Sequence, residues 1–242
     1  MLDSSATRSK LAMATIAIIP ARGGSKRVER KNIKDFCGQP IIKYSIDAAI
    51  KTGLFDEVIV STDDSEIART AVKFGASVPS LRSVKNSRDH STLADMMLEE
   101  IEKLEKRNIF PEYLCLLFAT TPTISAQEIA SGLKLLQKTN AQSVMSVCEF
   151  TEPVGRALKI ENGLVKMVNP RNKFTRTQDL ETRYFDAGRF YWIKRESFKK
   201  NKSFINRGTV PFVVSRLLVQ DIDTIEDWKM MEMKFKLLHK KR

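Results

Sequence analysis

The stretch Ile-Ala-Ile-Ile-Pro-Ala-Arg-Gly-Gly-Ser-Lys, residues 16–26, is the most informative part of the chain. Its first four residues form a short apolar run that Pro20 stops, and such a run is typical of a buried parallel strand. The glycines and cations that follow would lie at the carboxyl end of that strand, where α/β sheets bind their ligands. Because glycines let the backbone approach phosphate oxygens and cations neutralise their charge, the stretch predicts a triphosphate site.

This loop matches neither of the two common phosphate-binding motifs. The Walker A spacing, Gly-x4-Gly-Lys-Ser/Thr, is absent, and so is the dinucleotide fingerprint Gly-x-Gly-x-x-Gly. A solvent-exposed basic turn is the simpler alternative. The position of the loop directly after the first strand favours the nucleotide site.

Outward from this loop, strands and helices alternate along the chain. Apolar runs predict further strands, and helical periodicity between capping signals predicts helices. The expected strands lie at residues 57–61, 113–118, 143–149, 189–194 and 211–218, and the expected helices at 40–52, 63–74, 93–106 and 224–238. This alternation predicts an α/β protein with a Rossmann-like, mostly parallel sheet flanked by helices.

The alternation stops in residues 150–184, which are polar and rich in turn-forming residues. Strand candidates at 156–160 and 164–168 flank the pair Asn162-Gly163, which is a strong signal for a hairpin turn. We therefore expect a small antiparallel dimerisation insertion in the main domain. Such an insertion would cover the active site or meet a second subunit.

The composition limits the kind of protein. At 242 residues and 42% hydrophobic content, the chain suits one water-soluble domain, expected at residues 15–242 after a disordered lead-in at 1–14. The net charge of +12 permits a nucleic acid, an anionic membrane or an acidic small molecule as partner. The apolar runs are shorter than the roughly 20 residues that span a bilayer. Three widely spaced cysteines suggest no disulfide framework and indicate a cytoplasmic protein with reduced thiols.

A second constellation, Gln220-Asp221-Ile222-Asp223, has two carboxylates at alternate positions. In an extended segment these side chains point to one face, where their hard oxygens suit Mg2+ that also bridges substrate phosphates. The spacing alone is more typical of a turn or a helix cap. Thr224, with the acidic residues after it, has the pattern of a helix start.

Together these segments resemble the CMP-sialate synthetase family, the cytidylyltransferases for sialic-acid-like sugars. The resemblance is carried by residues 19–26 with Lys31 and Asn32 following, Val-Ile-Val-Ser-Thr-Asp-Asp at 58–64 and Gln-Asp-Ile-Asp-Thr at 220–224. In this family the first loop holds the CTP phosphates and the aspartate pair holds magnesium. The resemblance therefore implies Mg2+ as cofactor, bound by Asp221 and Asp223, and reverses the preference for a helix cap.

The resemblance also implies the reaction, its residues and a homodimer. The anomeric hydroxyl of an acidic nine-carbon sugar would attack the α-phosphorus of CTP, and pyrophosphate would leave in line. The expected catalytic residues are Arg22, Lys26, Asp221 and Asp223. The expected CTP- and sugar-binding residues are Ala21, Arg22, Gly23, Gly24, Ser25, Lys26, Lys31, Asn32, Arg82, Ser91, Thr92, Thr120, Thr121, Asp186 and Gly188. Asp63 is expected to organise the site rather than to bind metal.

Two departures from the usual motifs of the family indicate the sugar. Ala119-Thr120-Thr121-Pro122 replaces the usual Gln-Pro-Thr-Ser-Pro, and Asp186-Ala187-Gly188 stands where Asn-Gly is usual. This pattern resembles the branch that acts on pseudaminic acid, with legionaminic or N-acetylneuraminic acid as alternatives.

An alternative from another class is a basic nucleic-acid-binding module. Such a module would need a continuous basic face with exposed aromatic residues. The informative cations here gather instead in one glycine loop. We therefore expect CTP and an acidic sugar as partners, and neither a nucleic acid nor a membrane.

Overall fold

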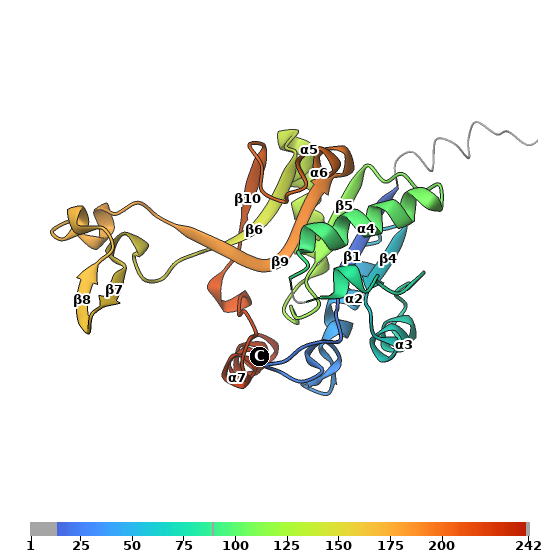
Figure 1. The fold of residues 1–242 in the computed structure, drawn as a ribbon, viewed down its shortest axis with the longest axis horizontal. Helices are drawn as coiled ribbons and strands as arrows, with labels where there is room; N and C mark the ends of the chain where they lie inside the picture. Colours follow the sequence, from blue (N-terminus) through green and yellow to red (C-terminus); the bar gives the residue numbers. More distant parts are fainter. Residues whose placement is uncertain (1–13, 89, 241–242) are drawn as a thin grey trace, which may run out of the picture.

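The computed structural model describes residues 14–88 and 90–240, and its centre is a six-stranded sheet with helices on both faces (Figure 1). The strands of this sheet are β1 (Thr15–Pro20), β4 (Glu57–Ser61), β5 (Tyr113–Leu117), β6 (Ser143–Glu149), β9 (Tyr184–Lys194) and β10 (Thr209–Val213). The helices are α2 (Ile41–Lys51), α3 (Ser65–Lys73), α4 (Leu93–Lys106), α5 (Ala126–Thr139), α6 (Arg195–Asn201) and α7 (Ile225–His239). The lead-in expected at residues 1–14 lies, except for Ala14, outside the described residues.

The strand order across the sheet is β10-β6-β9-β5-β1-β4. β1 runs parallel to both β4 and β5, and β10 runs parallel to β6. β9 lies between β5 and β6 and runs antiparallel to both of them. The predicted mostly parallel sheet is therefore confirmed, while the reversed central strand is a feature that the apolar pattern did not reveal.

Strand β1 illustrates how the two helical layers form. Ala17 and Ile19 lie in an apolar cluster with residues of α2, α3 and α5 on one face of the sheet. Ile16 and Ile18 lie in a second cluster with residues of α4 and α6 on the other face. Each of these four side chains is at most 1% exposed. Because both faces are covered, the apolar run is continuous rather than alternating with polar residues.

Three helices begin at capping boxes, in which a hydroxyl residue and an acidic residue three positions later satisfy each other's backbone N–H groups. The pairs are Thr92 with Asp95 in α4, Ser125 with Glu128 in α5, and Thr224 with Asp227 in α7. The helix start predicted at Thr224 is confirmed. Helices α5 and α6 were not predicted, although Ser125-x-x-Glu128 is a recognisable helix start.

Helix α7 packs on a small two-stranded ladder formed by β2 (Asp35–Phe36) and β3 (Gln39–Pro40). The ring of Phe36 lies 5.4 Å from the rings of both Trp228 and Phe235. The same apolar cluster contains Ile222, which is 1% exposed. This packing holds the segment with the two aspartates against residues 28–41.

Residues 150–183 leave the sheet and carry the hairpin of β7 (Leu158–Glu161) and β8 (Leu164–Met167), which extends away from the sheet in Figure 1. Asn162 and Gly163 have φ angles of 54° and 76°, as the tight turn of such a hairpin requires. The predicted hairpin is confirmed. All of residues 150–184 are described, and none of them is buried.

The three cysteines are free thiols in this fold. Cys115 and Cys148 are buried, and burial raises the pKa of the Cys115 thiol well above its ordinary value, which keeps it protonated. Among the helices of residues 14–88 and 90–240, none has the length and apolar character needed to cross a membrane.

Candidate active site

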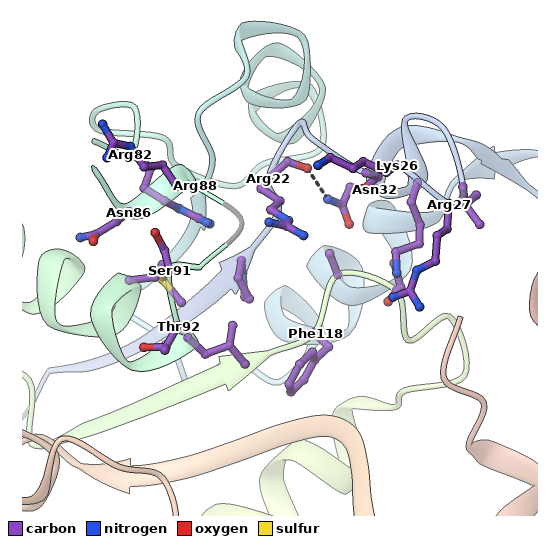
Figure 2. Close-up of a pocket in the computed structure, with 18 of the residues that line it drawn as sticks. Arg22, Lys26, Arg27, Asn32, Arg82, Asn86, Arg88, Ser91, Thr92 and Phe118 are labelled. Atoms are coloured by element: carbon purple, nitrogen blue, oxygen red, sulfur yellow. Dashed lines mark hydrogen bonds between the residues drawn. The ribbon is translucent and has the colours of Figure 1, made fainter. Parts of the chain in front are cut away.

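A cavity of about 640 Å³ lies at the carboxyl ends of β1 and β5 (Figure 2). Its walls are the glycine loop that follows β1, the polar segment that precedes α4, and the turn that follows β5. The lining residues are Pro20, Arg22, Ser25, Lys26, Arg27, Val28, Lys31, Asn32, Arg82, Asn86, Arg88, Ser91, Thr92, Leu93, Met96, Phe118, Ala119, Thr120 and Asp223. A cavity of this size is typical of a small-ligand site, and it lies where the sequence predicted one.

Two aspartates at the end of β4 shape the glycine loop. The backbone N–H of Gly23 donates to Asp63 Oδ1 at 2.8 Å. A Cβ atom on Gly23 would lie 2.8 Å from Asp64 Oδ2, so this close approach requires glycine. As predicted, Asp63 organises the loop, and the motif at residues 58–64 acts by holding the backbone of the site.

Basic side chains surround the cavity on several sides. In Figure 2 Arg22 reaches towards its middle, with Lys26 and Arg27 on one side and Arg82 and Arg88 on the other. The loop that carries Arg22 is fixed by Asn32, whose Nδ2 donates to the Arg22 carbonyl oxygen at 2.9 Å. Cations that converge on one cavity attract a polyanion. The arrangement therefore suits the phosphates of a nucleotide.

Arg82 is a buried member of this set, with 8% of its surface exposed. Its Nε donates to Ser61 Oγ at 3.1 Å, and its backbone N–H donates to the Thr62 carbonyl oxygen at 2.7 Å. Ser61 Oγ in turn donates to Glu100 Oε1 at 2.8 Å. Burial lowers the pKa of Arg82, although nearby carboxylates oppose this shift. A guanidinium held in this way is a preorganised donor for an anion in the cavity.

The aspartate pair lies beside the glycine loop, and of the two Asp223 lines the cavity. Arg27 Nη2 lies 2.7 Å from Asp223 Oδ1, and Lys31 Nζ donates to the carbonyl oxygen of Ile222 at 2.5 Å. Desolvation, followed by repulsion from Asp223, raises the pKa of Asp221. Two carboxylates that repel each other in this way favour a bound cation.

The two carboxylates of this pair are suitable ligands for Mg2+, although they would fill only part of its coordination sphere. Mg2+ prefers hard oxygen ligands and usually takes only one or two carboxylates, with water and substrate phosphates completing its coordination. Within residues 14–88 and 90–240, no group of three or more His, Cys, Asp or Glu side chains could hold a metal ion. Asp221 and Asp223 supply two such carboxylates, and the binding of Mg2+ by them stays a prediction.

The structure brings most of the predicted residues together. Those that line the cavity are Arg22, Ser25, Lys26, Lys31, Asn32, Arg82, Ser91, Thr92, Thr120 and Asp223. Those outside its lining are Ala21, Gly23, Gly24, Thr121, Asp186, Gly188 and Asp221. Thr121 is buried, and its Oγ1 donates to the Phe118 carbonyl oxygen at 2.7 Å, which supports the turn after β5. Contacts of all these predicted residues with substrates stay predictions.

Asp186 and Gly188 lie at an irregularity of β9. Gly188 has a φ of 58°, and its N–H donates to Asp186 Oδ1 at 2.8 Å. The Tyr191 hydroxyl donates to the other oxygen of Asp186, and burial together with this hydrogen bond raises the pKa of Tyr191. The Tyr191 ring also packs edge-on at 5.3 Å from Phe118, which lines the cavity. Asp186 is thus connected to the cavity wall through Tyr191.

Several lining residues escaped prediction from the sequence. Arg27 and Arg88 belong to the same loop and polar segment as predicted residues, so their charge was an available signal. Met96 and Phe118 carry no such signal, because their place in the lining depends on how the start of α4 meets the end of β5.

A cavity lined by cations at the edge of such a sheet is typical of α/β proteins that bind a polyanionic ligand such as a nucleotide. The chain belongs to the cytidylyltransferase family, whose profile matches residues 16–241. It is 36% identical over 228 residues to the pseudaminic acid cytidylyltransferase of Campylobacter jejuni, an alignment that covers 94% of this chain and 98% of that protein. It is 32% identical over 229 residues to the CMP-N,N'-diacetyllegionaminic acid synthase of Legionella pneumophila, with 91% and 95% covered.

Solved structures agree on the fold. The structure of CMP:2-keto-3-deoxy-manno-octonic acid synthetase in complex with CTP superposes with a TM-score of 0.66, and the match covers 93% of this chain and 99% of that one. A second match, 4-diphosphocytidyl-2C-methyl-D-erythritol synthase from Anaerococcus prevotii, has a TM-score of 0.62. Identities of 17% and 14% limit this comparison to the fold.

Proposed function

We propose that this protein transfers CMP from CTP to the anomeric hydroxyl of pseudaminic acid and releases pyrophosphate. The observation that supports this most directly is the convergence of basic side chains and Asp223 on one cavity at the carboxyl edge of the sheet. The similarity to the Campylobacter jejuni enzyme over nearly the whole chain supports the choice of sugar. The Legionella pneumophila relative keeps a legionaminic acid as the alternative substrate.

In this scheme the chain binds and orients the triphosphate. Arg22 and Lys26 contact its phosphates and offset the charge that develops as the sugar oxygen bonds to the α-phosphorus and the bond to pyrophosphate breaks. The hydroxyl proton of the sugar is released to solvent. Mg2+ bound by Asp221 and Asp223 would supply further charge neutralisation on the phosphates. Direct displacement of this kind needs no covalent bond to the protein.

The protein acts, in this proposal, as a homodimer in which the hairpin of residues 158–167 packs on a second copy. Pairing of β7 with β8 places Leu158 and Ile160 on the same face as Val165 and Met167. Ile160 and Val165 are 80% and 67% exposed. An apolar face of this kind marks an interaction surface, and a two-fold dimer is the commonest closed assembly. The free, partly buried thiols suit the reducing cytoplasm, where we place the protein.

The substrate is tested by incubating the protein with CTP, Mg2+ and one of three sugars while pyrophosphate release is measured. The sugars are pseudaminic, N,N'-diacetyllegionaminic and N-acetylneuraminic acid. We expect kcat/KM to be highest for pseudaminic acid, because buried polar groups left unpaired by the wrong stereoisomer cost about 1 to 3 kcal/mol each. Equal or faster turnover of another sugar would contradict the choice of sugar, and no pyrophosphate with any of them would contradict CMP transfer.

The dimer is tested by light scattering at micromolar protein. A mass near the 27.5 kDa of one chain would contradict the proposal. Ile160→Asp should dissociate the dimer, since it places a charge in the apolar face. Lys159→Ser is the matched control on the opposite face of the same strand, and it should leave the mass unchanged.

A further inference from the structure

Arg189 is a buried arginine that does not belong to the cavity lining, with 1% of its surface exposed. It lies where the pairing of β6 with β9 shifts register between Met145 and Val147. Opposite this shift, Ser146 Oγ accepts from the backbone N–H groups of Arg189 at 3.3 Å and Phe190 at 3.1 Å. An irregularity of this kind redirects a side chain. Here it directs the Arg189 guanidinium into the interior.

The guanidinium joins three segments that are far apart in the sequence. Arg189 Nη2 lies 2.9 Å from Glu128 Oε2, the capping-box residue of α5. Nη1 donates to Thr123 Oγ1 at 2.8 Å and to the carbonyl oxygen of Leu218. Thr123 Oγ1 itself donates to the same Leu218 oxygen at 2.7 Å. One planar fork therefore ties the start of α5, the turn after β5 and the segment before the aspartates.

This connection has a geometric consequence for the site. Thr120 lines the cavity three residues before Thr123, and Asp221 follows Leu218 by three residues. Each of the two active-site segments therefore contacts the Arg189 guanidinium three residues away from its site residue. A guanidinium presents its donors in a fixed plane, so it sets distance and angle together, which an ammonium cannot do.

We propose that Arg189 is a positioning residue that holds the segment of Asp221 and Asp223 in register with the turn carrying Thr120 and Thr121. Arg189 does not touch the reactants in this proposal. It acts through Thr123 and Leu218. The assignment of metal and substrate to these two segments rests on the proposed function.

The test compares Arg189→Lys with wild type in two measurements. The first is the affinity for Mn2+ in the presence of CTP and without sugar, followed by the electron paramagnetic resonance signal of free Mn2+. We expect affinity to fall about tenfold, the size seen when groups that orient metal ligands are changed. The second is kinetic, and we expect the KM for the sugar to rise while the Kd of CTP in metal-free buffer stays at its wild-type value.

Arg195→Lys is the matched control. Arg195 is the first residue of α6, directly after β9, and its Nη1 lies 2.8 Å from Glu105 Oε1. The substitution therefore disturbs an arginine–glutamate pair outside the cavity lining. It should leave Mn2+ affinity and sugar KM unchanged. Thr123→Val removes the hydroxyl that accepts from Arg189. It should lower Mn2+ affinity and raise the KM for the sugar, each by less than Arg189→Lys does. This variant serves as the test if Arg189→Lys fails to fold.

Wild-type Mn2+ affinity and sugar KM in Arg189→Lys, or an equal shift in Arg195→Lys, would overturn the inference. The two proposals remain distinguishable. If wild type releases no pyrophosphate, the proposed function fails, whereas the Mn2+ measurement still reports whether Arg189 positions the aspartates.

Discussion

The central sheet and the insertion of residues 150–184 contain the same kinds of apolar residues in opposite surroundings. Ile18 of β1 is fully buried between two helical layers, whereas Ile160 of β7 is 80% exposed. The sheet finds cover for both of its faces within the chain. The insertion forms its hairpin through local turn chemistry and finds no such cover. The difference teaches that this chain covers the apolar residues of its sheet by itself, whereas it leaves those of the hairpin exposed.

The charged groups differ in the same way. In the sheet domain, some ion pairs connect distant parts of the chain, as Arg27 does with Asp223 at 2.7 Å. In the insertion they are local, as in the pair of Arg176 with Asp179, three residues apart, at 2.7 Å. Exposed local pairs contribute little to stability. The long-range pair of Arg27 with Asp223 instead lies at the wall of the cavity.

Turnover should give the largest contrast between the two regions. Asp223→Ala should lower kcat about a thousandfold, because it removes one of the two carboxylates proposed to hold the Mg2+ that neutralises charge on the phosphates. Asp179→Ala, the matched change in the insertion, should keep kcat near the wild-type value. Pyrophosphate release at saturating CTP and Mg2+ measures both. A comparable loss in Asp179→Ala would show that the insertion also carries chemistry.

The second-largest effect is expected on the free energy of unfolding when the buried Ile18, rather than the exposed Ile160, is shortened to alanine. Ile18→Ala leaves a cavity in the sheet core and should cost about 4 kcal/mol. Urea denaturation followed by circular dichroism in dilute protein measures this cost. A cost below about 1 kcal/mol would mean that the core relaxes around the site.

Acid stability provides a smaller contrast. Burial alone would raise the pKa of Glu99, but hydrogen bonds from Ser83, Lys103 and Asn86 outweigh it and lower this pKa to about 2. Because the folded pKa lies below the ordinary value of 4.5, the stabilisation is complete above about pH 4.5 and is lost as the pH falls towards 2.

At neutral pH this stabilisation should amount to roughly 2 kcal/mol, after allowance for solvent screening. Glu99→Gln should lose it, so the difference from wild type in urea denaturation shrinks as pH falls from 6 to 3. Glu161→Gln is the control in the insertion, where the carboxylate is solvated. A pH-independent effect in Glu99→Gln would assign its cost to packing rather than charge.

The smallest effect is expected in the hairpin itself. Ile160→Ala should change the stability of the isolated protomer by less than about 0.5 kcal/mol, the usual range for surface positions. The measurement is urea denaturation at protein concentrations low enough to dissociate a dimer. A cost that grows with protein concentration would support packing of this face on a second copy, whereas a large cost in the protomer would contradict the comparison.

Local patterns predicted much of the fold. The bounds expected for β4, α4 and β6 agree with the structure to the residue, and the hairpin turn at Asn162-Gly163 was clear in the sequence. The direction of β9 was not predictable, since an apolar run does not indicate whether a strand pairs in parallel or antiparallel. That choice depends on strands that are distant in the sequence. Its first five residues were also missed, because they continue the exposed insertion rather than an apolar run.

The candidate site likewise contains residues that the local sequence predicted and residues that it did not. Arg22, Ser25 and Lys26 lie within one short loop, so their spacing was enough to predict that they share a cavity. The contact between Arg27 and Asp223 joins residues 196 positions apart and leaves no trace in local spacing. Arg189 had no signal either, because only the register shift opposite Ser146 turns it inward.

The place of β9 between β5 and β6 also sets the order in which the chain can be built. During synthesis β6 is made before β9, yet within the sheet it is joined to β5 only through β9. Until residues 184–194 leave the ribosome, β5 and β6 each present an unpaired edge, and such edges are prone to wrong pairing. A nascent chain that stalls in the insertion would therefore need protection, and the cavity can take its final form only after the last third of the protein has emerged.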